Sequence, residues 1–347
     1  MQTWRFSYVC TSNTRIYSFS AVVPSMISFR RIHGYSISSI LLTASLILSF
    51  LPLHAQRTVS ITIDDVPNTR MYQDDNFHSP LLDSLDAMHI PITIFINEGA
   101  LDRTNARARN REVLRNWMAR DYITPGNHTL HHARYSAVGI DSFKVEIDSG
   151  ELLTRMLAHQ YHKSLDYFRF PYNDLGKDSV EHHAIAAYLH ARKYVLTPFT
   201  VESSDYMYNY IYADLLRTGN GSEAARIGEE YIGYTLRLFQ YIDSLSMAIY
   251  GRQIHQIYLC HDNPLNRDYL NRLIRTLSDK GYTCISLAEA LTDPVYSQPS
   301  LYYKKWGISW LYRWITGSDE RRRCMQAEPP MKEINDRYDA MMKKQEK

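Results

Sequence analysis

An apolar run that ends in two adjacent carboxylates, Ser60-Ile61-Thr62-Ile63-Asp64-Asp65-Val66-Pro67, constrains what this chain can fold into. Its alternating β-branched residues predict a short buried strand, and the proline stops the hydrogen-bonded ladder. Two like charges at a strand exit repel each other unless a cation lies beside them. An isolated Asp-Asp pair more often belongs to a solvated loop. Here histidines, an arginine and another aspartate follow later strand-like runs, which favours a functional site.

The first 55 residues contain no Asp or Glu and predict a targeting segment. Ser38 to Leu53 is apolar, Arg30-Arg31 precedes it, and Leu53-His54-Ala55 is an acceptable cleavage site. A start at Met26 would give this signal peptide an ordinary length, and the residues before it would be an over-extended start. Because the apolar run is short for a membrane-spanning helix, we expect export to the periplasm or the medium.

Composition excludes some classes of protein. The chain has 39 Lys and Arg against 37 Asp and Glu, and four of the basic residues lie in the leader, so the remainder is nearly neutral and has no electrostatic footprint for nucleic acid. Four cysteines without a CxxC pair are too few for a disulfide scaffold or a metal knuckle. Cys260 and Cys284 are expected to be small core residues.

Strand-like runs alternate with helical ones about seven times after the aspartate pair. The strands are expected at 91–96, 122–124, 167–170, 193–197, 254–260 and 282–286, and the helices at 79–89, 106–120, 140–161, 179–191, 206–217, 222–250, 264–280 and from 287. Such alternation predicts an α/β protein with parallel βαβ units, closed as a deformed (β/α) barrel or open as a doubly wound sheet. We assign this α/β domain to residues 56–297.

The segment 298–347 is expected to be a separate helical tail. Trp306, Trp310 and Trp314 recur at i, i+4 and i+8 and predict an aromatic stripe on a helix. Such a stripe more often docks on the domain that it follows; peripheral contact with a membrane or a glycan is the less favoured alternative. The charged end, Met331 to Lys347, predicts a solvated helix or a frayed terminus.

Histidines follow the third expected strand, in Asn127-His128-Thr129-Leu130-His131-His132. His128 and His132 are four residues apart, so on one helical turn both imidazoles would face the same point. Two imidazoles and a carboxylate suit zinc or a similar divalent ion. His131 offers a rival i, i+3 pairing, and a lone histidine would more often be structural.

Other polar groups follow further strands, at the end where parallel α/β folds build their sites. They are Phe168-Arg169-Phe170-Pro171-Tyr172, Glu202-Ser203-Ser204-Asp205-Tyr206 and Tyr258-Leu259-Cys260-His261-Asp262. An arginine that enters a core usually needs a carboxylate partner. Each group alone is a weak signal, because an Asp in a loop is usually a cap and a His after a strand is usually solvated.

The ordered set Asp-Asp, His-x-x-x-His, Arg-x-Pro-Tyr, Asp-aromatic and Leu-x-His resembles the polysaccharide deacetylases, carbohydrate esterase family four, over about residues 58–291. The resemblance implies a NodB-like deformed barrel of about seven parallel strands, of the glycoside hydrolase/deacetylase type. It also implies hydrolysis of N-acetyl groups on amino sugars of a chitin-like or peptidoglycan-like glycan by a metal-activated water. The substrate partner would be a polysaccharide or oligosaccharide.

Roles follow from the resemblance, position by position. It implies one divalent ion, with zinc as the first candidate, held by Asp65, His128 and His132. The catalytic residues that it implies are Asp64 as general base, Arg169 as the group that orients this base, Tyr172 as an oxyanion donor through its backbone N–H, His261 as general acid and Asp205 as the charge partner of this acid. The substrate-binding residues that it implies are Leu259 at the acetyl methyl, Tyr206 as an aromatic wall, and Pro171.

Two positions depart from the family pattern. Val66 stands where a glycine is usual, so the backbone there must avoid positive φ. Tyr206 stands where a larger tryptophan is usual. The departures leave the substrate open: an O-acetyl esterase or a cyclic-amide hydrolase on the same scaffold is one alternative, and a catalytically silent glycan-binding domain is another. A silent relative would be expected to lose a metal ligand or the base, and this chain has all of them.

Overall fold

The computed structural model describes residues 57–345, which lie within one compact unit. The expected signal peptide, residues 1–55, lies outside the described residues. No helix in the described range combines the length and the apolar character needed to cross a membrane.

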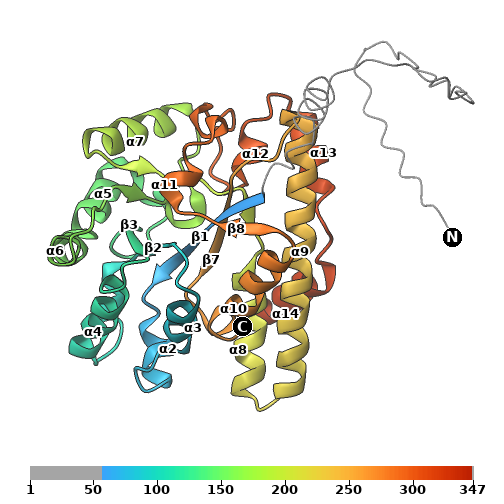
Figure 1. The fold of residues 1–347 in the computed structure, drawn as a ribbon. Coiled ribbons are helices and arrows are strands. Elements are labelled where there is room, and N and C mark those ends of the chain that lie inside the picture. The colour runs from blue at the N-terminus through green and yellow to red at the C-terminus, as the bar shows by residue number, and fades with distance from the viewer. Residues whose placement is uncertain (1–56, 346–347) are drawn as a thin grey trace, which may run out of the picture. The chain divides into compact units, whose positions relative to one another are not determined.

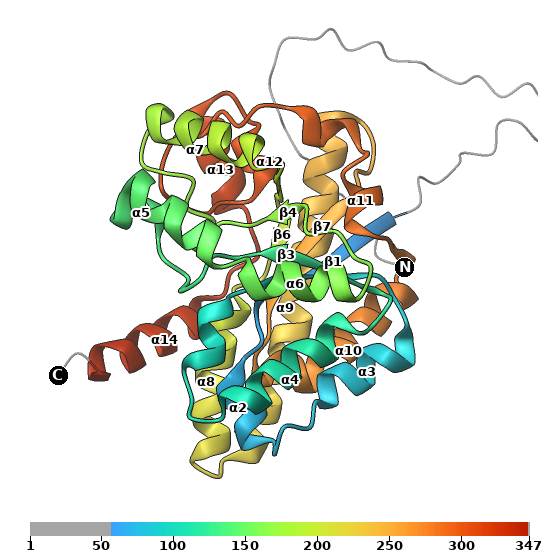
Figure 2. The same cartoon turned by 90° about the vertical axis from the view of Figure 1, so that its left-hand side faces the viewer.

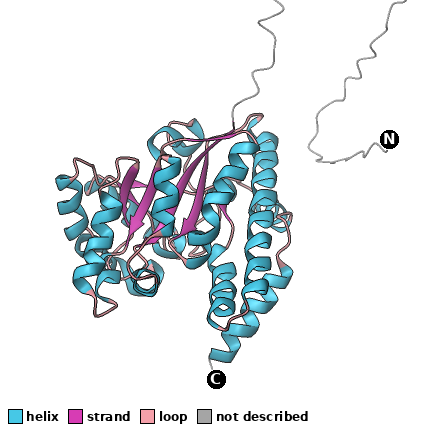
Figure 3. Cartoon of the chain, turned by 60° about the horizontal axis from the view of Figure 1, so that its bottom comes forward, coloured by secondary structure: helices cyan, strands magenta, loops and turns pink. Residues whose placement is uncertain are grey.

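A parallel sheet lies at the centre of the fold, with helices around it (Figures 1 and 3). The strands are β1 (Arg57–Val66), β2 (Ile92–Ile96), β3 (Ile123–Asn127), β4 (Tyr167–Phe168), β5 (Val195–Leu196), β6 (Val201–Glu202), β7 (Gln256–His261) and β8 (Tyr282–Cys284). Their order is β5-β4-β3-β2-β1-β7-β6, and β8 pairs with the start of β1. These seven strands form a curled half-barrel, which confirms the predicted deformed barrel of about seven parallel strands with a helical C-terminal region.

Helices connect the strands and continue beyond the last of them. They are α2 (Thr69–Asp74), α3 (Pro80–Met88), α4 (Arg107–Met118), α5 (Tyr135–Ser149), α6 (Leu152–Gln160), α7 (Ser179–Ala191), α8 (Asp205–Arg217), α9 (Gly221–Tyr250), α10 (Pro264–Asp279), α11 (Leu287–Ala290), α12 (Trp310–Arg313), α13 (Ser318–Gln326) and α14 (Lys332–Gln345). Short 3-10 turns occupy η1 (Glu98–Asp102), η2 (Pro171–Asn173) and η3 (Pro294–Ser297).

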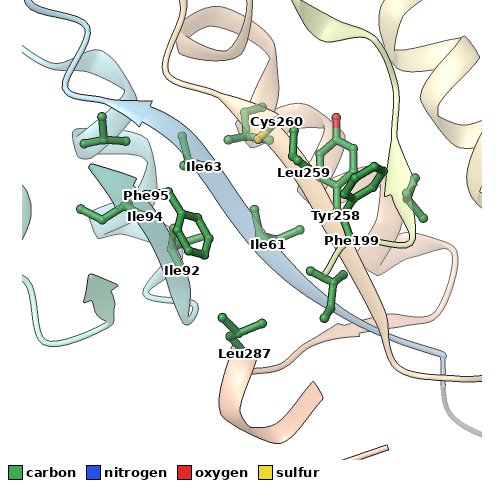
Figure 4. Close-up of a cluster of buried hydrophobic side chains, with 14 of the residues drawn as sticks. Ile61, Ile63, Ile92, Ile94, Phe95, Phe199, Tyr258, Leu259, Cys260 and Leu287 are labelled. Carbon is green, nitrogen blue, oxygen red and sulfur yellow. The ribbon is translucent and has the colours of Figure 1, made fainter. Parts of the chain in front are cut away.

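The central strand β1 is buried on both faces. Ile61 and Ile63 have no exposed surface, and the intervening Thr62 is also buried. Figure 4 shows Ile61 and Ile63 among side chains of the neighbouring strands, including Ile94 of β2 and Leu259 of β7. One face of β1 is apolar, whereas the other carries polar side chains that are also buried: Thr58, Ser60, Thr62 and Asp64.

Three expectations about local structure were wrong. The helix expected over 140–161 is two helices, because α5 ends at Gly150, where an added Cβ would lie 2.5 Å from the backbone N of Leu130. Glu202 is the last residue of a separate strand, β6, and does not follow the strand expected over 193–197. The tryptophan stripe does not form, because α12 contains only Trp310 to Arg313 and Trp306 lies outside it.

The C-terminal region packs against the rest of the unit. Trp310 and Trp314 are buried, and Ile334 of α14 has no exposed surface. The charged end therefore forms a docked helix. The boundary at residue 297 between a catalytic domain and a tail stays a prediction. Cys260 is buried and Cys284 half-buried, and no disulfide joins them.

Candidate metal and catalytic site

A cleft of about 920 Å³ opens at the carboxyl ends of β1, β3 and β7. Its lining includes most of the predicted site residues: Asp64, Asp65, His128, His132, Tyr172, Tyr206, Leu259 and His261. Arg169 and Asp205 are fully buried outside this lining. Arg169 contacts Asp64, and Asp205 contacts His261. Pro171 is buried and does not line the cleft, so its contact with substrate stays a prediction.

Asp65, His128 and His132 form the one group of three potential ligands found among the described residues, with ligand atoms within 4.8 Å of one another. The Oδ1 of Asp65 lies 3.8 Å from Nε2 of His128 and 3.5 Å from Nε2 of His132. These separations are too long for hydrogen bonds. They are close to about 3.4 Å, which is the distance between two ligand atoms on a tetrahedral zinc ion with bond lengths of about 2.0–2.2 Å. The residues therefore fit a divalent ion.

The orientation of His128 also suits a ligand. Its Nδ1 lies 2.8 Å from the carbonyl oxygen of Arg169, which can only accept, so Nδ1 carries the proton and Nε2 presents a lone pair to Asp65. Burial, followed by the neighbouring His132, lowers the pKa of His128 to about 3. Burial also lowers the pKa of His132. Both imidazoles are thus neutral at ordinary pH, as metal ligands must be.

The two histidines do not share a helical turn, so the expected reason for their convergence was wrong. Residues 128–134 form a loop with positive φ at Thr129 (69°) and His132 (61°). The Nδ2 of Asn97 donates to the carbonyl oxygens of His128 and Thr129, and Oδ1 of Asn127 accepts from the backbone N of Thr129 at 2.7 Å. The loop brings the imidazole centres to 5.0 Å.

His131 points away from this group. Its Nδ1 bonds Oε1 of Glu146 at 2.9 Å, and its side chain is 65% exposed. The sequence alone left the pairing of His128 with His131 open, and the geometry favours His132.

We predict that His132→Ala loses the bound ion and that His131→Ala keeps it. Of these two histidines, only His132 belongs to the three-residue group. The measurement is metal content by elemental analysis of both purified variants, with wild type alongside. Loss of metal from His131→Ala with retention in His132→Ala would mean that the other histidine pair binds the ion.

The two aspartates face the same histidine. Strand alternation would make adjacent side chains diverge. Instead Asp65 has φ 63°, and the β1–β2 register shifts between Ile63 and Val66. Consequently Oδ2 of Asp64 and Oδ1 of Asp65 both lie 3.8 Å from Nε2 of His128. The expectation that the two aspartates diverge was therefore wrong. Val66 avoids positive φ, as expected, and the residue with positive φ is Asp65.

The partners of the two aspartates differ. Asp64 is 2% exposed, and its Oδ1 accepts from Nη1 of Arg169 at 2.8 Å. The same Nη1 donates to Oγ1 of Thr62 at 2.7 Å, and Nη2 donates to the carbonyl of Pro198. This network holds Asp64 in place. Asp65 has a 41% exposed side chain and faces the two histidines.

His261 and Asp205 form a second buried pair. The Nδ1 of His261 lies 2.6 Å from Oδ1 of Asp205, whose Oδ2 accepts from the backbone N of His261 and from the amides of Asn263 and Asn266. Burial alone would lower the pKa of His261, but the charge and hydrogen bond of Asp205 outweigh it and raise that pKa to about 10. His261 is therefore a protonated donor at neutral pH. In the sheet it lies opposite Asp64.

The remaining predicted residues form the walls of the cleft. Leu259 is 1% exposed, while Tyr172 and Tyr206 are half-exposed. Tyr172 has φ 57° within η2, and its ring centre lies 4.5 Å from that of His132. An apolar floor beside a polar rim suits an acyl group joined to a sugar.

Sequence reasoning missed several lining residues. Asp262 is 1% exposed, and its Oδ1 has no hydrogen-bond partner. Burial raises the pKa values of both Asp262 and Glu202 to about 7. The position of Asp262 directly after His261 was a usable signal. Trp306 was noted only as part of an aromatic stripe, and for Tyr338, far along the chain, no signal existed.

Comparison with known proteins gives a family for part of the chain. Residues 54–191 match the family model described as Polysaccharide deacetylase. This match confirms the resemblance over residues 54–191, which are similar to polysaccharide deacetylases. The matched range contains the aspartate pair, the histidines and Arg169, and ends before Asp205 and His261.

Solved structures are similar at low identity. A variant of a peptidoglycan deacetylase from Bacillus subtilis is 16% identical over 68% of this chain and 91% of that chain, with a TM-score of 0.42. A family 4 carbohydrate esterase from Streptomyces lividans, solved with acetate, is 18% identical over 68% and 96%, with a TM-score of 0.42. A family pseudoenzyme from Bacillus anthracis is 14% identical over 68% and 66%, also with a TM-score of 0.42. No curated protein matches the chain.

Proposed function

We propose that this protein is an exported, metal-dependent deacetylase that hydrolyses N-acetyl groups of amino sugars in a glycan. The observation that carries the proposal is the convergence of Asp65, His128 and His132 beside a base and an acid on neighbouring strands, Asp64 and His261. Residues 1–55, with their apolar run and absence of acidic side chains, support export.

Asp65, His128 and His132 would hold one divalent ion, with zinc as the first candidate. When bound, such an ion supplies a Lewis acid that polarises the amide carbonyl and makes water nucleophilic at neutral pH. Asp64, held by Arg169, accepts a proton as the water oxygen bonds to the carbonyl carbon. Leu259 packs against the acetyl methyl, and the backbone N–H of Tyr172 donates to the developing oxyanion.

His261 completes the reaction. Its imidazolium donates a proton to the sugar nitrogen as the carbon–nitrogen bond breaks, which leaves acetate and a free amine. A base and a separate acid are both required, because the attacking water must lose a proton and an amide nitrogen leaves only after it gains one. Asp205 keeps the acid charged at neutral pH.

The test is acetate release from chitin fragments, peptidoglycan and acetylated xylan, and ring opening of small cyclic imides, by the zinc-loaded protein. We expect release from one of the N-acetylated glycans. Release from xylan alone would identify an O-acetyl esterase, and opening of imides alone a cyclic-amide hydrolase. No release from any substrate by protein with intact metal would mean that this is a silent glycan-binding domain.

We predict that Asp205→Asn moves the alkaline limb of the pH profile of kcat to lower pH. Without the charge of Asp205, burial lowers the pKa of His261, and an acid donates only while it is protonated, so activity is lost at a lower pH than the wild-type limit set by a pKa of about 10. The measurement is kcat against pH on the substrate found above. Asp214→Asn, an exposed substitution on the same helix, should keep the wild-type profile; an unshifted Asp205→Asn profile would contradict the pairing.

A further inference from the structure

One wall of the cleft comes from the C-terminal region, which lies outside the residues matched by the family model. Trp306, Gly307 and Tyr338 line the same cleft as the metal-ligand group. The side chain of Trp306 is 57% exposed, whereas Trp117, Trp310 and Trp314 are buried. Nζ of Lys305 lies over the indole, 5.0 Å from the ring centre, and the rest of the ring is exposed in the cleft. An aromatic side chain exposed in a cleft is typical of a binding surface.

A buried arginine fixes this wall to the active-site turn. Arg313 has no exposed surface, and its Nη2 donates to the carbonyl oxygens of Asn173 at 3.2 Å and Trp306 at 3.0 Å. Its Nη1 donates to the carbonyl of Tyr302 at 3.3 Å. A buried guanidinium is tolerated only when its donors are used, so Arg313 determines where the main chain of Trp306 lies relative to the turn that contains Tyr172.

The contact with the turn is direct. A Cβ added to Gly307 would lie 2.2 Å from the carbonyl oxygen of Tyr172, so only glycine permits this approach. Farther on, Oγ of Ser309 donates to the carbonyl of Thr200 at 2.7 Å, and the backbone N of Trp310 donates to that of Phe199 at 3.0 Å. The segment is thus held at both ends of the exposed indole.

Helix α14 supports the same side of the cleft. It runs beside α8 (Figure 2), and Tyr338 packs edge-on against Tyr206 with ring centres 6.0 Å apart. Arg337 of α14 bonds Glu223 of α9 at 2.8 Å. Tyr206, which stands where a larger aromatic residue is usual in the family, therefore gains an aromatic neighbour from the C-terminal region.

We propose that Trp306 is the stacking platform for a sugar unit adjacent to the one that is deacetylated, so that the C-terminal region selects an oligosaccharide over a single sugar. This inference rests on the proposed function. The apolar face of a pyranose ring matches the flat indole. The cleft volume of about 920 Å³ lies near the top of the ~300–1,000 Å³ typical of ligand sites, which suits more than one sugar unit.

The first test is steady-state kinetics on N-acetylglucosamine and its pentamer. Trp306→Ala should raise KM for the pentamer about fivefold, as expected for the loss of one aromatic stacking contact, and leave kcat and the reaction of the monomer unchanged. Trp306→Phe should recover most of the affinity. Tyr303→Ala is the matched control, because Tyr303 is an exposed aromatic residue of the same segment that lines a different cavity.

The second test reads binding without turnover. Among the described tryptophans Trp306 alone is well exposed, so the pentamer should protect the wild-type fluorescence from acrylamide quenching and give no protection in Trp306→Phe. A wild-type KM in Trp306→Ala, or undiminished protection in Trp306→Phe, would overturn this inference while the deacetylase activity stands. A wild-type enzyme that neither hydrolyses nor binds any glycan would overturn the proposed function and this inference together.

Discussion

Replacing Asp64 by asparagine should leave the metal content near the wild-type value and lower kcat by about 10²–10⁴-fold, the range expected for a lost general base. The ion is expected on Asp65 and the two histidines, whereas Oδ1 of Asp64 is occupied by Arg169. An asparagine has almost the same shape but cannot accept a proton from water at neutral pH. The measurements are deacetylation of the substrate from the screen and elemental analysis of the same samples.

Asp65→Asn is the matched variant, because it makes the same chemical change at the next residue. It should lose metal and activity together, while His261→Ala should resemble Asp64→Asn, since an acid that protonates the amine is not a ligand. Loss of the ion from Asp64→Asn and its retention in Asp65→Asn would invert the assignment. If neither aspartate mattered to turnover, the proposed enzyme activity would be wrong.

Replacing Arg169 by methionine should lower the free energy of unfolding by about 3–5 kcal/mol, the cost of leaving one member of a buried ion pair without its partner. Arg169 and Asp64 are both at most 2% exposed, and Nη1 also bonds Thr62. The Asp64 carboxyl group would remain buried without the cation that accompanies it in the wild type. Urea unfolding monitored by circular dichroism gives the change.

Arg217→Met is the control for this prediction. Arg217 pairs with Asp214 at 2.6 Å on α8, but its side chain is 74% exposed, so the loss should stay below about 1 kcal/mol. Arg169→Lys keeps the positive charge and should lie between wild type and Arg169→Met. Equal losses in Arg169→Met and Arg217→Met would show that the buried pair contributes no more than a surface pair.

The sequence was sufficient for the fold because its signals are local. The β-branched run of β1 and the alternation of strands with amphipathic helices depend on neighbours a few residues away, and buried parallel strands have few alternative arrangements. Local signals fail where backbone conformation is set by distant contacts. The short strands β4, β5 and β6 have too few residues for a periodic pattern, and the break at Gly150 depends on its approach to the loop at Leu130.

The site, like the fold, was predictable from the sequence only in part. Which residue types take part was readable from the sequence, because polar groups at the ends of consecutive parallel strands share one edge of the sheet. The backbone geometry that brings these groups together could not be predicted from the sequence. Asp65 and His132 have positive φ, the register shifts in β1, and Asn97 holds the loop that contains the histidines. Together these features turn both aspartates and both histidines toward one point.

The C-terminal wall was decided by tertiary structure alone. The spacing of Trp306, Trp310 and Trp314 predicted one helical face, yet two of these indoles are buried and the third lines the cleft. Helical periodicity assumes a helix. Here Gly307 and the hydrogen bonds from the Arg313 side chain to main-chain carbonyls hold an irregular segment against the turn at Tyr172. Residue types and their order determined the chemistry available to this protein, whereas contacts between residues far apart in the chain decided where that chemistry is assembled.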